Sequence, residues 1–188
     1  MEDKVISAVR CWVETLVVAK NLCPFAKREL DSNRARFTVT AATTEEQLLQ
    51  ALHAELQLLD NDHTIATTLL IHPWVLQDFS DYNQFLSQAE HLLLQLGLSG
   101  VYQLASFHPH YQFNGTTTDA AENYTNRAPY PLLHVLREES LARAIESYPN
   151  VEQIPIRNIE QMNSLGEDKL RALLQACVGP TKTNTRGD

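Results

Sequence analysis

The chain has 188 residues, of which 44% are hydrophobic and 20% charged, and its 15 basic and 23 acidic side chains give a formal net charge of −8. This ordinary globular composition allows a sizeable core, so neither disulfides nor a structural metal is needed for folding. The acidic balance and the scattered basic residues argue against a nucleic-acid partner, while a local basic pocket for a small anion stays open.

The first predicted elements are a long helix and a strand. Apolar residues between Val5 and Leu16 recur at three- and four-residue steps, which indicates an amphipathic helix. This helix should end near Asn21, because Pro24 disfavours a helical conformation at the residue before it. The segment Phe37–Ala41 alternates in polarity and is β-branched, so we predict a strand there.

The middle of the chain repeats this order of helix and strand. We predict a helix that opens at Thr43-Thr44-Glu45-Glu46 and runs to about Leu59, a strand over Thr67–His72, a helix over Tyr82–Gln95 and a strand over Val101–Phe107. Each connection is long enough for a crossover, so the three strands should run parallel and be joined right-handedly.

The C-terminal third is predicted to be mostly helical. The expected elements are a helix over Leu132–Ser147, an edge strand over Val151–Ile156, and short helices over Arg157–Asn163 and Glu167–Val178. Residues 1–180 are thus expected to form a single α/β domain, with a small, mostly parallel sheet of three or four strands and flanking helices. Residues 181–188 are expected to be a flexible tail.

The three cysteines, Cys11, Cys23 and Cys177, form an odd set without a CxxC spacing. This pattern argues against a disulfide framework and suits a reducing compartment. The N-terminal segment does not resemble a signal peptide, and no apolar run approaches the ~20 residues of a membrane span. We therefore expect a cytoplasmic protein in which Cys11 and Cys177 are packing residues.

The sequence lacks the common motifs of cofactor and hydrolase sites. It contains no GxGxxG, GxxxxGK[ST], HExxH or GxSxG, so no cofactor is predicted. The polar and aromatic stretch from Ser106 to Arg137 lies between the third strand and the next predicted helix. A connection of this length is uncommon in a compact domain and usually belongs to a binding loop, although it can also simply cover a sheet edge.

Two histidines follow apolar strands and precede prolines, His72 in IHP and His108 in FHP. In open parallel sheets, ligands bind beyond the carboxyl ends of the strands, so these imidazoles are candidates for an acid and base pair. The alternative is that each ring is hydrogen-bonded to the backbone. His108 and His110 also form an HxH pair, but Pro109 interrupts the strand and no further ligands stand out, so no metal site is predicted.

Two further side chains are candidates for chemistry. Cys23 is expected at the cap of a short helix that begins at Pro24, where a lowered thiol pKa would make it a nucleophile, although such a cysteine is more often a buried apolar group. Arg127 lies beside Asn123 and Asn126, and its forked guanidinium suits a carboxylate or phosphate. It is equally suited to tie the loop to the sheet through backbone carbonyls.

Three motifs, NLCPFA, SFHPHYQF and NYTNRAPYPLLHVLRE, resemble a bacterial family catalogued as domain of unknown function 1415, over nearly the whole chain. The family carries no assigned reaction, and its position after FHP, here His110, is not fixed as histidine, which speaks further against metal. The polar positions that match the motifs are Cys23, His108, Tyr111, Gln112, Asn123, Tyr124, Asn126, Arg127, Tyr130, His134, Arg137 and Glu138.

The leading hypothesis is a protein that binds a small, anionic molecule and performs hydrolysis or group transfer. In it His108 is the general acid and base, Cys23 a nucleophile or pocket wall, and Arg127 the anion clamp. The ligand-binding set is completed by Asn123, Asn126, Tyr111, Gln112 and His72. The alternative is a non-catalytic interaction module that uses the aromatic loop 107–131. If His108 and Arg127 are buried and fully bonded to backbone, the catalytic hypothesis fails.

Overall fold

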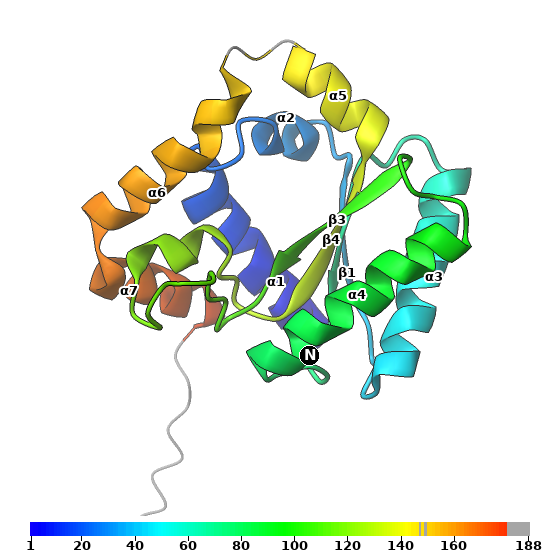
Figure 1. Ribbon diagram of the computed structural model, residues 1–188, viewed down its shortest axis with the longest axis horizontal. Coiled ribbons are helices and arrows are strands. Elements are labelled where there is room, and N and C mark those ends of the chain that lie inside the picture. The colour runs from blue at the N-terminus through cyan, green and yellow to red at the C-terminus, as the bar shows by residue number, and fades with distance from the viewer. Residues whose placement is uncertain (147, 149, 180–188) are drawn as a thin grey trace, which may run out of the picture.

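The computed structural model describes residues 1–146, 148 and 150–179, and in this part of the chain a four-stranded sheet lies between two layers of helices (Figure 1). The strands are β1 (Ala35–Val39), β2 (Thr67–Ile71), β3 (Tyr102–Phe107) and β4 (Leu132–Arg137), in the spatial order β1-β2-β4-β3. The chain is therefore a mixed α/β protein, as predicted.

The sheet is not mostly parallel, and this part of the prediction is wrong. Only β1 and β2 pair in parallel, while β4 lies between β2 and β3 and pairs with both in antiparallel orientation. As a result β1, β2 and β3 all run in the same direction, but β4 separates β3 from β1 and β2. The helix expected over Leu132–Ser147 is instead β4 followed by α5 (Glu138–Glu146).

Residues of β4 alternate between the two faces of the sheet. Leu133 and Val135 join the core on one face, and Leu132 joins the core on the other. This period of two marks a strand, whereas the spacing of Leu132, Leu133 and Leu136 also fits a helical stripe. Pairing with β2 and β3 on both sides decides between the two, because it satisfies the backbone of a segment that is buried in the centre of the sheet.

The two faces of the sheet carry different helices (Figure 1). On one face lie α3 (Glu45–Asn61) and α4 (Phe79–Gln95). On the other, α1 (Glu2–Trp12) packs on β1 and continues into the π-helical turn η1 (Val13–Val18), with α7 (Glu167–Val178) packed along α1. The remaining elements are α2 (Ala26–Asp31), the 3₁₀ turns η2 (Ala121–Thr125) and η3 (Val151–Gln153), and α6 (Ile154–Leu165).

Most helix ends follow their local sequence signals. The helical segment formed by α1 and η1 ends at Val18, close to the predicted end at Asn21, and Asn21 itself has a φ of 50°, a left-handed conformation that asparagine tolerates well. Thr44 caps α3 by accepting the Gln47 N–H, and the Gln47 side chain accepts the Thr43 N–H at 2.8 Å. The predicted strand over 151–156 is wrong, since Pro155 occupies the first turn of α6, where its missing N–H costs nothing.

Cys11 of α1 and Cys177 of α7 form a disulfide, with Cα atoms 5.4 Å apart. That distance lies in the usual range for disulfides. The prediction of no disulfide, with both residues acting as packing groups, is therefore wrong. Their separation of 166 residues conceals the pair in the sequence, and the packing of α7 along α1 brings them together.

No helix among the described residues is long and apolar enough to cross a membrane. The predicted tail, residues 181–188, and Ser147 at the end of the predicted fourth helix lie outside the described residues.

Candidate functional site

The long loop between β3 and β4 is ordered by its own polar side chains. Asn123 is fully buried, and its side-chain oxygen accepts hydrogen bonds from the Phe113 N–H at 3.0 Å and the Thr116 hydroxyl at 2.9 Å. Its amide nitrogen donates to the Thr117 carbonyl at 2.8 Å. Gln112 donates to the Thr116 carbonyl in the same turn. The amides thus fasten the loop to itself.

Arg127 completes this network. Its Nε donates to the Tyr111 carbonyl at 3.1 Å, a terminal nitrogen donates to the Thr118 carbonyl at 2.6 Å, and its guanidinium lies 4.7 Å from the centre of the Tyr124 ring. Asn126 ties the loop to the sheet by donating to the Ser106 carbonyl at 3.0 Å. Of the two roles open to Arg127 in the sequence, the geometry favours the structural one.

His108 is fully buried, and both of its ring nitrogens are engaged by backbone. Nδ1 accepts the His110 N–H at 3.0 Å, so Nε2 carries the proton and donates to the Leu76 carbonyl at 3.2 Å. Burial lowers the pKa of His108 to about 4. The imidazole is therefore neutral at pH 7 and has no nitrogen left for a ligand.

His72 lies close by, as expected from the two strand ends. Its ring and that of His108 both pack on Tyr82, at centroid distances of 5.7 and 5.1 Å. Nδ1 of His72 donates to the Val75 carbonyl at 3.1 Å, and burial lowers its pKa to about 4. Its Nε2 is buried without a hydrogen-bond partner in the described chain.

The aromatic residues of the loop pack mainly on neighbouring rings. Tyr111 lies with its ring centre 5.0 Å from those of both Phe79 and Phe113, and Tyr124 is buried under Arg127. These contacts make the strand-end cluster a closed structural unit. His108 is buried with both ring nitrogens bonded to backbone, and Arg127 is buried with two of its nitrogens bonded to backbone carbonyls, so the geometry of both residues favours a structural role.

A cavity of about 290 Å³ lies on the opposite face of the sheet from α3 and α4. It is lined by residues of all four strands, the junction of α1 and η1, residues between Leu22 and Leu30 that include part of α2, and residues of α5. Most of these side chains are apolar, and the volume is at the lower end of the range of small-molecule sites. This cavity is the candidate functional site.

His134 of β4 and Thr67 of β2 supply polar groups to the cavity wall. The Thr67 hydroxyl has one proton, which it donates to the Val135 carbonyl at 2.6 Å, so the 2.6 Å bond to His134 must be donated by His134 Nε2. Nδ1 of His134 then keeps its lone pair, and it has no hydrogen bond to the described chain. Burial lowers the pKa of His134 to about 4, which keeps the ring neutral.

Trp12 is a second polar participant, at the junction of α1 and η1. The residue lines the cavity and is only 2% exposed, yet its indole N–H has no hydrogen-bond partner in the described chain. Buried donors are nearly always paired, because an unmet one costs about 1–3 kcal/mol. A ligand or water molecule with an acceptor atom would satisfy this N–H.

Cys23 also lines the cavity, just before α2. Its expected low pKa is not found: burial raises the pKa of the thiol, and hydrogen bonds from the backbone of Phe25 and Ala26 only partly offset this effect. The short helix begins at Ala26 rather than at Pro24. Cys23 is therefore a protonated, polarizable part of the cavity wall, which is the second of the two roles considered for it.

Sequence reasoning missed His134 and Trp12 as candidate site residues. His134 stands in the motif segment LLHVLR, and reading this segment as a strand would have placed it on the same face as Leu132 and Leu136. The signal was present but was hidden by the helical prediction. Trp12 gave no such signal, because an indole on the apolar side of an amphipathic helix is predicted to be a core residue.

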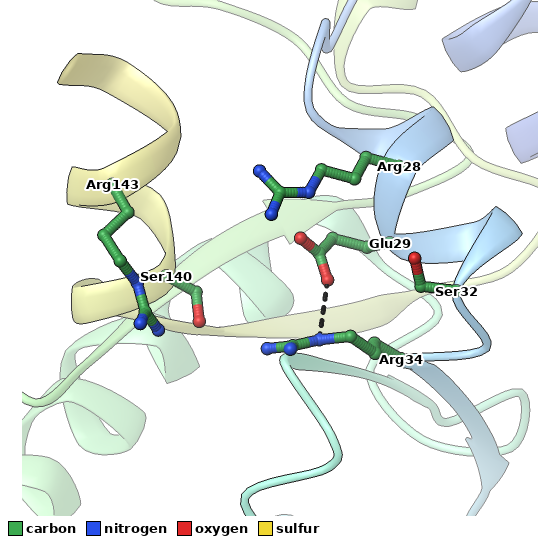
Figure 2. A pocket seen from close by; sticks show the side chains of 6 residues that line it. All are labelled: Arg28, Glu29, Ser32, Arg34, Ser140 and Arg143. Atoms are coloured by element: carbon green, nitrogen blue, oxygen red, sulfur yellow. Dashed lines mark ion pairs between the residues drawn. The ribbon is translucent and has the colours of Figure 1, made fainter. Parts of the chain in front are cut away.

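A smaller pocket of about 190 Å³ adjoins the cavity, formed by Arg28, Glu29, Ser32, Arg34, Ser140 and Arg143 (Figure 2). Glu29 and Ser140 line both spaces. Arg34 Nε lies 3.1 Å from a Glu29 carboxylate oxygen, and Arg143 pairs with Glu139 at 3.4 Å. The apolar cavity therefore has a cationic neighbour.

Comparison with curated proteins and with solved structures gave no significant match. A family model described as "Protein of unknown function (DUF1415)" matches residues 4–172, which is nearly the whole chain. The match spans every strand, both walls of the cavity and all the motif positions named above. The chain therefore belongs to the DUF1415 family.

Proposed function

We propose that the protein binds a small, largely apolar molecule in the 290 Å³ cavity between the sheet and the segments η1, α2 and α5. The observation that carries this proposal is the combination of an apolar wall with polar atoms, among them Trp12 Nε1 and His134 Nδ1, that lack hydrogen-bond partners in the described chain. Trp12 offers a donor, and His134 Nδ1 offers an acceptor. Small-molecule sites typically combine apolar walls with a few such groups, which fix the orientation of the ligand.

The energetics favour an apolar ligand with at least one polar atom. Each methylene removed from water contributes roughly 0.8 kcal/mol, so a short chain in the cavity supplies several kcal/mol. An acceptor atom near Trp12 would also remove the penalty of its unpaired N–H. A hydroxyl group can serve both Trp12 and His134, because it donates and accepts.

Binding is better supported than proton transfer at this site. A base is most effective when its pKa lies near the working pH, whereas burial holds the pKa of His134 at about 4. At pH 7 the imidazole is a good hydrogen-bond acceptor but a weak base. The raised pKa of Cys23 likewise disfavours a thiolate nucleophile. We therefore assign both residues to recognition.

Filling the cavity should weaken binding without harming the fold. Ala105 of β3 lines the cavity, and Ala105→Leu adds apolar atoms to empty space. We expect the free energy of unfolding of this variant to be about 1 kcal/mol higher than that of the wild type, because filling a cavity often stabilises a protein. It should also lose at least tenfold in affinity for 1-octanol and octanoate in calorimetric titrations.

Ala54→Leu is the matched control, because Ala54 is exposed on α3, on the other side of the sheet. It makes the same substitution and should leave affinity unchanged. If Ala105→Leu binds these probes as tightly as the wild type, the cavity is not the binding site. If neither probe binds the wild type at millimolar concentration, the proposed function is wrong.

A further inference from the structure

The smaller pocket, here called the arginine pocket after Arg28, Arg34 and Arg143, is positioned to complete the ligand site. Its lining contains three guanidinium groups and one carboxylate, although the formal net charge of the chain is −8. In Figure 2 the side chains of Arg28 and Arg34, from the α2 side, and Arg143, from α5, reach toward a common space. Such a concentration of cations stands out against the acidic remainder of the protein, and it favours an anion at this place.

Two of the three arginines have carboxylate partners, whereas the third, Arg28, adds a positive charge that no ion pair in the described chain offsets. Arg34 is paired with Glu29, and Arg143 with Glu139 outside the pocket, through side chains that are 61% and 72% exposed. Arg28 has no ion pair or side-chain hydrogen bond to the described part of the chain. Guanidinium groups bind carboxylate and phosphate oxygens in a forked arrangement that lysine cannot reproduce.

At the boundary between the pocket and the cavity lies a hydroxyl group that has no hydrogen-bond partner in the described chain. The Ser140 hydroxyl is buried without a hydrogen-bond partner in the described chain, and Ser140 lines both spaces. Glu29 lines both as well and is held by Arg34. A ligand oxygen at this boundary could accept from Ser140 while the rest of the anionic group contacts the arginines.

We infer that the ligand is an amphiphilic anion, with a carboxylate or phosphate head group among Arg28, Arg34 and Arg143 and an alkyl tail in the cavity. This inference rests on the proposed function and specifies its substrate class. The apolar cavity alone would accept any small hydrocarbon, whereas the adjoining cations select an acid. Because the head group remains near water, binding should weaken as salt screens the arginines.

The test compares ligands that differ only in head group or only in tail. Octanoate, octyl phosphate, 1-octanol and hexanoate are titrated calorimetrically into the wild type. We expect octanoate or octyl phosphate to bind at least tenfold more tightly than 1-octanol. Octanoate should bind roughly 15-fold more tightly than hexanoate, because hexanoate lacks two methylenes and each contributes about fourfold in affinity. The tighter of the two acids identifies the head group.

Arg28→Ala supplies the decisive variant. It should weaken octanoate binding by tenfold or more and leave 1-octanol unchanged, because a charged hydrogen bond contributes about 1.5–3 kcal/mol. The control is Lys27→Ala, which removes the neighbouring cation of α2, whose partner is Asp31 and which does not line the pocket. It should change the affinity for octanoate less than twofold.

The outcomes separate this inference from the proposed function. If octanoate and 1-octanol bind equally, and Ala105→Leu blocks both, the cavity is the site and the anionic head group is rejected. If octanoate binds independently of tail length and of Ala105→Leu, but needs Arg28, an ion binds at the surface and the amphiphile is rejected. If no probe binds, the proposed function fails together with the inference.

Discussion

Acidification from pH 6.5 to pH 4 should destabilise the protein by several kcal/mol, because three histidines are buried in the neutral form. Burial lowers the pKa values of His72, His108 and His134 to about 4, from 6.5 for an unperturbed histidine. Between these two values the unfolded chain binds protons that the folded protein excludes. The stabilisation is therefore complete above pH 6.5 and is lost as the pH falls toward 4.

The slope of this loss can be measured directly. Three extra protons in the unfolded state correspond to a slope of about 4 kcal/mol per pH unit near the middle of the window. Urea unfolding at closely spaced pH values gives the slope, and NMR titration of the histidine ring protons gives the three pKa values. His72→Phe keeps a ring against Tyr82 and removes one titrating group, so the slope should fall by about a third.

The result would contradict the buried arrangement if the three imidazoles titrated near pH 6.5. An unchanged slope in His72→Phe would likewise show that this residue does not contribute. The total stability of His72→Phe at pH 7 is a separate quantity, because the hydrogen bond to the Val75 carbonyl is also lost. Only the change of stability with pH tests the prediction.

Arg127→Met should destabilise the protein by about 3 kcal/mol without weakening ligand binding. The substitution leaves the carbonyls of Tyr111 and Thr118 without their charged donor, and each such hydrogen bond contributes about 1.5–3 kcal/mol. Methionine keeps much of the apolar stem, so the loss reports mainly on the guanidinium. Arg127→Lys should recover only part of the stability, since an ammonium group does not match the fork.

The measurement combines urea unfolding with amide hydrogen exchange over residues 111–118, where exchange should accelerate. Arg28→Ala is the control, because this exposed arginine has no partner within the described chain and its removal should change stability by less than about 0.5 kcal/mol. A stable Arg127→Met variant that had lost affinity for octanoate would reverse the assignment. Arg127 would then be the anion clamp that the sequence suggested.

The order of elements up to β3 followed from local patterns, because those helices and strands carry their own periodicity and caps. The placement of β4 did not, since Leu132–Arg137 fits both periods and only its neighbours β2 and β3 decide between them. This one segment changes the sheet from mostly parallel to mixed. The disulfide between Cys11 and Cys177 was missed for a related reason, because it depends on how two distant helices pack.

The candidate site illustrates the same limit at the level of single residues. The motifs direct attention to polar groups, but they do not distinguish a residue that binds a ligand from one that fastens a loop. Asn123 and Arg127 fasten the loop, as their hydrogen bonds to backbone show. The cavity lined by Trp12 and His134 arises from the gap that α1, α2 and the sheet leave between them, which no local pattern encodes.

The position of β4 in the centre of the sheet also affects how the protein emerges from the ribosome. Because β4 follows β3 by 24 residues of loop, a nascent chain that ends before Leu132 holds β2 with one unpaired edge and β3 without its sheet neighbour. These strand edges present unpaired backbone N–H and C=O groups, which are prone to pair with other chains. The first three strands must therefore wait for the last one, and protection by a chaperone would be most useful during that interval.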